Sequence, residues 1–151
     1  MNGERDGLRE LYQELILDHG RRPRNFRGMP DADHSAEGHN PLCGDQLTVH
    51  LRIEQGRIAE ASFVGHGCAI STASASLMTE AVRGLTVAEA EALFRDVHAM
   101  LTGAPPPERA FGKLAVLGGV RDYPARVKCA TLAWHTLHNA LAGGGQAAST
   151  E

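Results

Sequence analysis

The sequence predicts an α+β domain in which an N-terminal helix precedes a small antiparallel sheet of about three strands, and C-terminal helices cover that sheet. The length of 151 residues suits one domain, and 42% of the residues are apolar, which is enough for a single core. Apolar and polar residues alternate over residues 47 to 64, as in two half-buried strands, whereas helical spacing dominates before and after this stretch. This order favours a sheet that is covered on one face.

The first predicted helix is followed by a loop-rich region. Its apolar residues recur at helical spacing, and they are Leu8, Leu11, Tyr12, Leu15 and Ile16. We expect Gly20 to end this helix as a left-handed cap. Glycines and prolines interrupt residues 26 to 42, so mostly loop is predicted there, with a possible short edge strand near residues 36 to 39.

A β-hairpin follows the loop-rich region. Alternating apolar residues predict a first strand over residues 47 to 53 and a second strand over residues 57 to 64. Gln55 and Gly56 supply the tight turn between them, because glycine accepts a positive φ. On the second strand, Ser62 is expected to face outward.

Two helices are predicted after the hairpin. Ser71 or Thr72 can cap the first of them, which is expected to stop at Gly84. The sequence Thr86-Val87-Ala88-Glu89 is a capping box, so it predicts the start of a second helix, which continues to about residue 102.

The C-terminal part is predicted to contain a short helix and a long one. The short helix begins near Phe111 and is expected to end at Gly118-Gly119. Pro124 suits the first turn of the long helix, whose apolar stripe predicts a buried face. This stripe consists of Val127, Ala130, Trp134, Leu137 and Leu141. The chain is therefore predicted to form one domain over residues 1–151, with flexible ends at residues 1–7 and 144–151.

The composition argues against several classes of partner. The net charge is −3 and no run of five or more basic residues occurs, which argues against nucleic acid as the main partner. The apolar runs are too short for a membrane span, so no membrane partner is expected. The polar N-terminus does not resemble a secretory signal, and a cytoplasmic location is therefore the expectation.

The three cysteines are the candidate functional residues. Without an export signal, an odd number of cysteines favours metal ligands or reactive thiols over a disulfide framework. The spacing of Cys43, Cys68 and Cys129 matches no zinc finger, so three unrelated buried cysteines remain an alternative at this point.

The predicted hairpin would bring two of these cysteines together. Cys43 precedes the first strand and Cys68 follows the second, and these two ends of a hairpin are neighbours. Asp45 lies close to Cys43 in the chain. Cys68 also lies at the entrance of a helix, where unpaired N–H groups and the helix dipole stabilise a thiolate. We expect the Lys128 ammonium to favour the ionised form of the next residue, Cys129. Three thiolates and one carboxylate suit tetrahedral zinc.

Five groups of residues carry a family resemblance. In chain order they are Leu11-Tyr12-x-x-x-Ile16-x-Asp18-His19, Pro23-x-Asn25, Asn40-Pro41-x-Cys43-Gly44-Asp45, Gly67-Cys68-Ala69-Ile70-Ser71-x-Ala73-Ser74-x-Ser76 and Lys128-Cys129-Ala130-Thr131-Leu132-Ala133-Trp134. Together they resemble the IscU/SufU family of iron–sulfur cluster assembly proteins. Lys128 stands where IscU-like proteins carry a histidine, and the long segment between Cys68 and Cys129 resembles an insertion of SufU-like proteins, so the SufU-like branch is favoured.

The resemblance implies an IscU-, SufE- and NifU-like fold and a zinc-dependent sulfurtransferase. Such a protein accepts sulfur from the persulfide of a SufS-type cysteine desulfurase, upstream of iron–sulfur scaffold proteins. Four residues would hold the zinc, and they are Cys43, Asp45, Cys68 and Cys129. A histidine of the desulfurase would replace Cys43 on the zinc, and the freed Cys43 thiolate would be the catalytic acceptor of the sulfur. Arg126 and Lys128 are candidates for guiding the docked partner.

Several alternatives stay open beside this interpretation. The same four residues could hold iron as a labile [2Fe–2S] cluster, which would make the protein an assembly scaffold. A zinc domain used only for binding is a further possibility. His66 could be an alternate ligand because it is close to Cys68 in the chain, whereas His19 is expected to be a helix-end residue. Arg126 could equally be a solvated arginine at a helix start.

Overall fold

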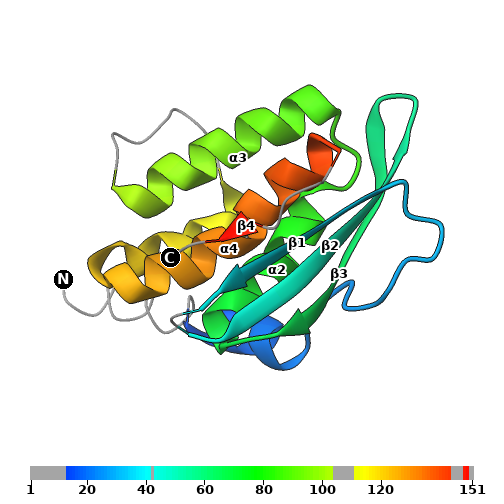
Figure 1. The fold of residues 1–151 in the computed structure, drawn as a ribbon. Helices are drawn as coiled ribbons and strands as arrows, with labels where there is room; N and C mark the ends of the chain where they lie inside the picture. The colour runs from blue at the N-terminus through cyan, green and yellow to red at the C-terminus, as the bar shows by residue number, and fades with distance from the viewer. Residues whose placement is uncertain (1–12, 42, 104–110, 144–147, 150–151) are drawn as a thin grey trace.

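A sheet on one side and a layer of helices on the other make up the fold (Figure 1). The structure is a computed structural model that describes residues 13–41, 43–103, 111–143 and 148–149. The strands are β1 (His34–Asn40), β2 (Asp45–Glu54), β3 (Arg57–His66) and β4 (Ala148–Ser149). The helices are α2 (Ala69–Val82), α3 (Val87–Thr102) and α4 (Pro124–Leu141), with the 3₁₀ helix η1 (Gly112–Asp122) before α4. The predicted α+β class is confirmed.

The sheet has the strand order β3-β2-β1-β4. Strand β1 pairs antiparallel with β2, and β2 with β3, as the sequence predicts. The edge strand is longer than the predicted residues 36 to 39, and the two-residue strand β4 lies parallel to it. Most of the ends predicted to be flexible, residues 1–7 and 144–151, lie outside the described residues, as do Leu8, Leu11 and Tyr12 of the first predicted helix.

The β2–β3 hairpin has the predicted turn. Gln55 and Gly56 both have positive φ, of 52° and 76°, as a two-residue type I′ turn requires. The outward orientation predicted for Ser62 is wrong, because this residue is fully buried between two buried neighbours. Residues 25–27 run along the outer edge of β3 and hydrogen-bond to Phe63, and His50 lies opposite Ser62 on β2, so β3 is covered more completely than alternation predicts.

Gly20 and the pair Gly118-Gly119 do not act as the sequence predicts. Residues 13–21 are helical, so Gly20 lies within this helix, and the left-handed cap predicted there is wrong. A Cβ atom on Gly20 would lie 3.3 Å from the Cβ of Ala69, so this glycine permits close packing against the start of α2. The end predicted at Gly118-Gly119 is also wrong, because η1 continues to Asp122 along the neighbouring helix α3.

Both predicted ends of α3, the start of α4 and the end of α2 are confirmed. Thr86 and Glu89 form both hydrogen bonds of the capping box that opens α3, and Gly103 ends α3 with a φ of 80°. Pro124 occupies the first turn of α4. Gly84 follows α2 with a φ of 87°.

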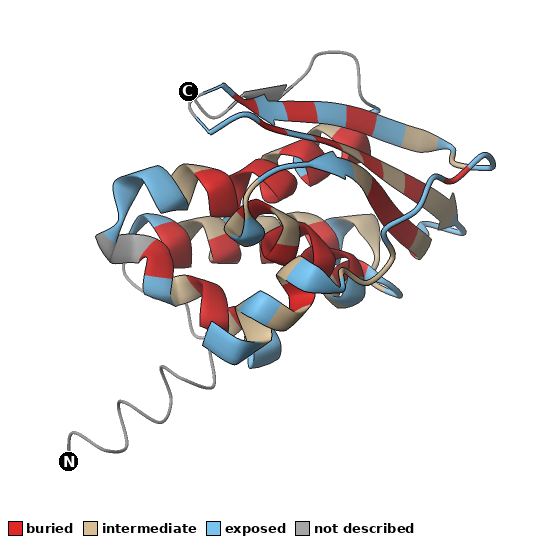
Figure 2. Ribbon diagram, turned by 90° about the horizontal axis from the view of Figure 1, so that it is seen from below, coloured by how far each residue is buried: buried red, intermediate tan, exposed pale blue. Residues whose placement is uncertain are grey.

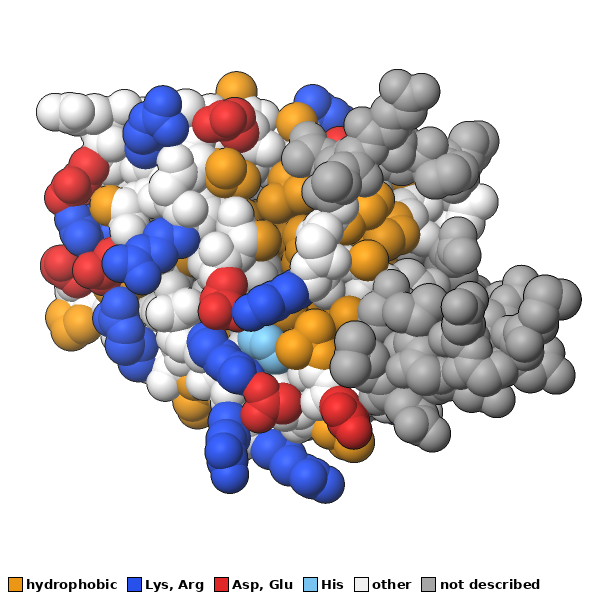
Figure 3. All heavy atoms as spheres, turned by 180° about the vertical axis from the view of Figure 1, so that it is seen from behind, with side chains coloured by type: hydrophobic (Ala, Val, Ile, Leu, Met, Phe, Trp, Pro, Cys, Tyr) orange, Lys and Arg blue, Asp and Glu red, His pale blue; other side chains and the backbone are white. Residues whose placement is uncertain are grey.

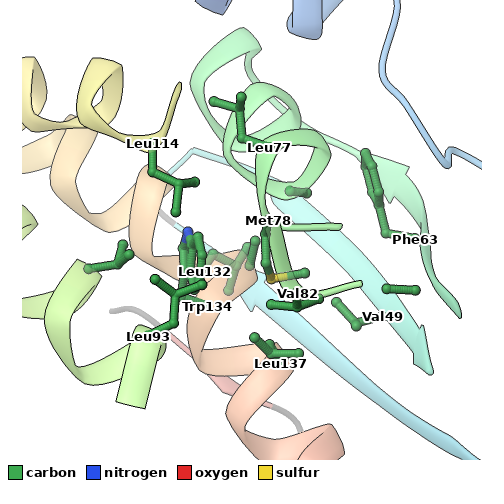
Figure 4. Packing of buried hydrophobic residues seen from close by; sticks show 14 of the residues in the cluster. Val49, Phe63, Leu77, Met78, Val82, Leu93, Leu114, Leu132, Trp134 and Leu137 are labelled. Carbon is green, nitrogen blue, oxygen red and sulfur yellow. The ribbon is translucent and has the colours of Figure 1, made fainter. Parts of the chain in front are cut away.

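Helix α4 is the centre of the core, and it packs against α2, α3, β1 and β2. Figure 4 shows side chains of α2, α4 and the sheet meeting between the layers, with Trp134 next to Leu93. The indole N–H of Trp134 donates to Ser74 Oγ at 3.1 Å, and Ser74 Oγ donates to the Ala130 carbonyl at 2.6 Å. Buried residues of α2 and α4 face the sheet or one another, α3 packs on α4 and η1, and exposed residues lie on the outside (Figure 2).

Basic and acidic side chains are interspersed on the surface (Figure 3). Arg24 pairs with Asp18 at 2.6 Å, and Arg27 pairs with Glu60 at 3.1 Å. Part of the positive charge that follows the first helix is therefore matched by carboxylates. Among the described residues, no helix has both the length and the apolar character that crossing a bilayer requires.

Strand β1 approaches α4 closely at Gly38. A Cβ atom there would overlap Thr136 Oγ1 and lie 3.1 Å from Leu132 Cδ1. Only a residue without a side chain lets the strand backbone pack directly on the helix. The end of β1 is thereby brought beside the first turns of α4.

The packing of α3 on α4 is expected to weaken on acidification. His135 of α4 lies against the rings of Phe94 and His98, at centroid distances of 5.5 and 5.2 Å. Burial lowers the pKa of His135, and the nearby His98 and His138 lower it further. The unfolded chain therefore binds a proton at His135 more readily than the folded chain does. The folding free energy that depends on neutral His135 is present above the ordinary pKa of about 6.5, and it is lost as the pH falls below that value.

The variant His135→Leu tests this pH dependence. We expect it to lose less free energy of unfolding than the wild type between about pH 7 and pH 5, because it lacks the group whose protonation favours unfolding. Urea denaturation of both proteins at a series of pH values measures the difference. Equal losses of unfolding free energy in the two proteins would show that the pH dependence does not come from His135.

Candidate metal centre

Three segments that are far apart in the sequence meet at one end of the sheet. Cys43 lies in the loop between β1 and β2, and Asp45 is the first residue of β2. Cys68 lies between β3 and α2, and Cys129 is in the first turns of α4. The end of β3 pairs with the start of β2, which brings the loop of Cys43 next to Cys68 as the hairpin argument predicts.

The side chains of these residues converge. The Sγ atoms of Cys43 and Cys129 are 3.4 Å apart, and the thiol of Cys129 donates to Cys43. One ligand atom each from Cys43, Asp45 and Cys129 lie within 4.8 Å of one another. Cys68 is not part of this group of three, but its Sγ lies 4.0 Å from Asp45 Oδ2. Three of the four predicted ligands therefore converge, and the fourth, Cys68, lies next to Asp45.

Asp45 is fixed by the backbone that carries Cys68. The Cys68 N–H donates to Asp45 Oδ1 at 2.8 Å, and the aspartate is only 1% exposed. A Cβ atom on Gly67 would lie 2.6 Å from the same oxygen, so glycine is needed there for the carboxylate to fit. The second carboxylate oxygen is left to face the sulfurs.

Cys68 is the N-cap of α2. Its backbone is extended, and its Sγ accepts a hydrogen bond from the Ser71 N–H at 3.4 Å. The sequence prediction that Ser71 or Thr72 caps this helix is wrong, because both lie inside α2. The expected contact between the Cys68 sulfur and the unpaired N–H groups of the helix start is confirmed.

Burial governs the electrostatics of Cys129. This residue is 0% exposed, and burial raises the pKa of its thiol, with further contributions from hydrogen bonding to Cys43, Cys68 and Asp45. The prediction that Lys128 favours the ionised form is therefore wrong for the metal-free protein, because desolvation disfavours the thiolate. A bound cation reverses this preference, since a coordinating thiol is deprotonated.

The loop of Cys43 differs from the rest of the site. Cys43 is exposed, whereas Cys68 is half-buried and Cys129 is buried. The Cys43 N–H donates to the Asn40 carbonyl at 3.3 Å, and Gly44 next to it has a φ of 71° with open space around its Cα. The exposed sulfur is thus held at the end of a tight turn.

The donor set fits a single zinc ion. Zinc–sulfur bonds of about 2.3 Å in a tetrahedron place two sulfurs about 3.8 Å apart, and a sulfur and a carboxylate oxygen about 3.6 Å apart. The corresponding distances here are 3.4 Å between Cys43 and Cys129 and 4.0 Å between Cys68 and Asp45. These two distances are close to those of a tetrahedral zinc site, so Cys43, Asp45 and Cys129 fit one ion, and Cys68 lies beside Asp45 as the candidate fourth ligand.

Comparison with known proteins gives the family. The sequence matches the NifU-like N-terminal domain over residues 11–142. The chain belongs to the NifU-like N-terminal domain family. It is 42% identical over 132 residues to the iron–sulfur cluster assembly scaffold protein IscU of Thermotoga maritima, covering 87% of this chain and 92% of that protein. It is 35% identical over 136 residues to the zinc-dependent sulfurtransferase SufU of Bacillus subtilis, covering 89% and 92%.

Solved structures agree with this membership of the NifU-like family. A crystal structure from Fervidobacterium islandicum AW-1, described as a putative iron–sulfur cluster assembly scaffold protein for the SUF system, superposes with a TM-score of 0.81. Its sequence is 35% identical, and the match covers 85% of this chain and 94% of that one. The resemblance to the IscU/SufU family and the predicted fold type are confirmed. Relatives with both names have similar identities, so identity favours neither branch.

Four other residues considered in the sequence lie outside the group of ligands. His66 is exposed at the end of β3 and does not belong to the group of close donor atoms. His19 is buried within the first helix, where its Nδ1 is 2.7 Å from Ser76 Oγ. Arg126 is exposed and Lys128 is half-buried, and neither forms an ion pair with a described residue. Their role in guiding a partner stays a prediction.

Asn40 belongs to one of the family motifs, but the sequence predicted no role for it in the site. Asn40 is 0% exposed, and its side-chain amide donates to Cys129 Sγ at 3.7 Å. The alternation of buried residues in β1 was the available signal, but the edge strand was predicted to end one residue earlier. A strand extended to residue 40 would have placed this asparagine on the inner face with Ala36 and Gly38.

Proposed function

We propose that this protein is a zinc-dependent sulfurtransferase that accepts persulfide sulfur from a SufS-type cysteine desulfurase during iron–sulfur cluster biogenesis. The unequal burial of its three sulfurs is the observation that carries the proposal. Cys43 alone is exposed, on a loop flanked by glycine, while Cys68 and Cys129 are held in the fold. The relative from Bacillus subtilis that is named a zinc-dependent sulfurtransferase supports this choice.

Cys43, Asp45, Cys68 and Cys129 are the residues that would hold the zinc. When bound, the ion would supply the positive charge that keeps buried thiols deprotonated near neutral pH. Asp45 is already fixed by the Cys68 N–H, and Cys68 by the Ser71 N–H, so both are oriented before binding. Such preorganisation lowers the cost of assembling the site.

The exposed position of Cys43 suits attack on a sulfur of another protein. Its thiolate would attack the outer sulfur of the desulfurase persulfide, so that a new S–S bond forms on Cys43. The S–S bond on the desulfurase breaks, and its cysteine leaves as a thiolate. Downstream iron–sulfur scaffold proteins would receive this sulfur. Cys129 is inaccessible to a second protein.

Arg126 and Lys128 are proposed to guide the desulfurase. Both lie in the first turns of α4, which also carry Cys129. Tyr123 at the start of this helix is 62% exposed, an unusual position for a large aromatic residue. An aromatic ring next to an arginine is typical of protein interfaces.

An iron–sulfur scaffold is the second candidate function. The relative from Thermotoga maritima that is named an iron–sulfur cluster assembly scaffold protein supports it, as the Bacillus subtilis relative supports the first candidate. The same four residues would have to spread around two irons, whereas three of their donor atoms already lie within 4.8 Å of one another. This compactness favours a single ion.

Persulfide mapping separates these candidates. The protein as purified is analysed for zinc and iron and is then incubated with a SufS-type desulfurase and cysteine. We expect about one zinc per chain, stimulation of the desulfurase and a sulfur adduct of about 32 Da on the peptide with Cys43. The variant Cys43→Ser is expected to lose the adduct and the stimulation.

Other outcomes would identify the alternatives. A Cys43→Ser variant that stimulates the desulfurase as well as the wild type does would exclude the transfer role. A visible-range chromophore after anaerobic reconstitution, with a cluster that moves to an apo-protein, would favour the scaffold. Zinc without any persulfide would indicate a structural site.

A further inference from the structure

The three sulfurs of the metal centre differ in their N–H donors. Cys129 Sγ accepts from the Asn40 side chain at 3.7 Å, and Cys68 Sγ accepts from the Ser71 backbone at 3.4 Å. Among the described residues, no N–H group donates to the sulfur of Cys43, whose partner is the Cys129 thiol. The buried sulfur of Cys129 and the half-buried sulfur of Cys68 therefore each have an N–H donor, and the exposed sulfur of Cys43 has none in the described part of the chain.

Asn40 is held in place by the contact between β1 and α4. It is the last residue of β1 and lies on the inner face of the strand, two residues after Gly38. The close approach at Gly38 sets the strand against Leu132 and Thr136 of α4. One turn before Leu132 on this helix is Cys129, so the packing of β1 directs the amide of Asn40 at its sulfur.

Asn40 also contacts the other residues of the site. Its backbone carbonyl accepts the N–H of Cys43 at 3.3 Å, and it is paired with Asp45 across the β1–β2 ladder. A fully buried amide is costly unless its polar atoms have partners. The side-chain amide has such a partner in Cys129 Sγ, whereas an apolar residue would suit an ordinary core position at the end of β1.

We propose that Asn40 is a positioning residue of the metal centre, whose side-chain amide holds the Cys129 thiolate as a permanent ligand and leaves Cys43 as the sulfur that reacts. This inference rests on the zinc centre of the proposed function. An N–H donor withdraws charge from a thiolate and stabilises its anionic, metal-bound form. The sulfur that lacks such a donor keeps more of its charge and is the better nucleophile.

Cobalt substitution tests this role by a readout other than activity. Co²⁺ replaces zinc in the purified wild type and in Asn40→Leu, which keeps a side chain of similar size without the amide. Loss of the N–H donor makes the Cys129 thiolate a stronger electron donor, so we expect its sulfur-to-cobalt charge-transfer band to shift to lower energy. Zinc affinity, measured by chelator competition, is expected to fall by about 10-fold or more, as for other outer-shell partners.

Thr136→Val is the matched control. It removes a buried hydroxyl that bonds to the Leu132 carbonyl at 2.7 Å, in the same contact of β1 with α4, without touching a sulfur. We expect it to leave the band and the zinc affinity unchanged. Asn40→Asp keeps the shape of the side chain and loses the N–H donor, so it is expected to shift the charge-transfer band as well. This variant replaces Asn40→Leu in the experiment if Asn40→Leu does not fold.

The outcomes separate this inference from the proposed function. A wild-type band that stays at the same energy in Asn40→Leu and Asn40→Asp would overturn the role of Asn40 and leave the metal centre intact. The same shift in Thr136→Val would also overturn it, because the effect would then come from packing. A wild type without any thiolate-to-cobalt band would overturn the metal centre and this inference together.

Discussion

Replacing Asp45 by alanine is expected to weaken zinc binding by more than about 100-fold, beyond the range of about 10–100-fold for outer-shell partners. The carboxylate does two things in the structure. Its Oδ1 accepts the Cys68 N–H at 2.8 Å, and its Oδ2 faces the sulfurs. Alanine removes both the proposed oxygen ligand and the acceptor that orients the start of α2. Zinc content after dialysis against a chelator of known affinity measures the loss.

Asp45→Asn is the matched control for this prediction. The amide oxygen still accepts the Cys68 N–H, so the fold and the position of Cys68 should be kept, while the negative charge next to the metal is lost. We expect an affinity between those of the wild type and Asp45→Ala. Should Asp45→Ala retain wild-type affinity, the carboxylate would not be a ligand, and three cysteines would have to hold the ion alone.

Gly65→Ala is expected to destabilise the fold by at least about 4 kcal/mol, the range of the most severe single substitutions. Gly65 has a φ of 141°, which is rare for residues with a side chain. A Cβ atom there would overlap the Gln46 carbonyl and lie 2.6 Å from Leu47 Cα. These are backbone atoms of the paired strand β2, so they cannot move without breaking the ladder next to Asp45.

Gly56→Ala provides the comparison at the other end of the same hairpin. Gly56 also has a positive φ, of 76°, but a Cβ atom there would meet nothing within 4 Å. Only the backbone strain of about 1–2 kcal/mol is therefore expected. Urea denaturation of the three proteins measures both values. Equal destabilisation by the two substitutions would show that the close contact with β2 does not matter.

Local patterns in the sequence were sufficient for most of the fold. The alternation of Leu47, Val49 and Leu51 and the capping box of Thr86 and Glu89 are short-range signals, and the structure has both elements. The failures occur where distant packing overrides local preference. Gly20 is a good helix end by propensity, yet the helix runs one residue further, and Gly20 instead permits close packing against Ala69 of α2. Ser71 is a better N-cap than cysteine by propensity, yet Cys68 caps α2, and its Sγ accepts the Ser71 N–H.

The candidate site was predictable only in part for the same reason. Cys43, Asp45 and Cys68 belong to the two ends of one hairpin, so their proximity follows from strand pairing. Cys129 comes from α4, and its hydrogen bond with Asn40 joins residues that are 89 positions apart in the chain. No local pattern encodes that contact. The high pKa of Cys129 likewise depends on burial, which outweighs the effect expected from its neighbour Lys128 in the sequence.

The separation of 86 positions between Cys43 and Cys129 has a consequence for biosynthesis. During translation, Cys43 and Cys68 leave the ribosome long before α4 has been made, so a nascent chain would present an incomplete set of donors. Domains generally fold once their whole sequence has emerged, and only then would Cys129 close the site. Binding of a metal ion at the proposed site should therefore be a late, post-translational event. Only chains in which the sheet and the helices have packed together would bind it.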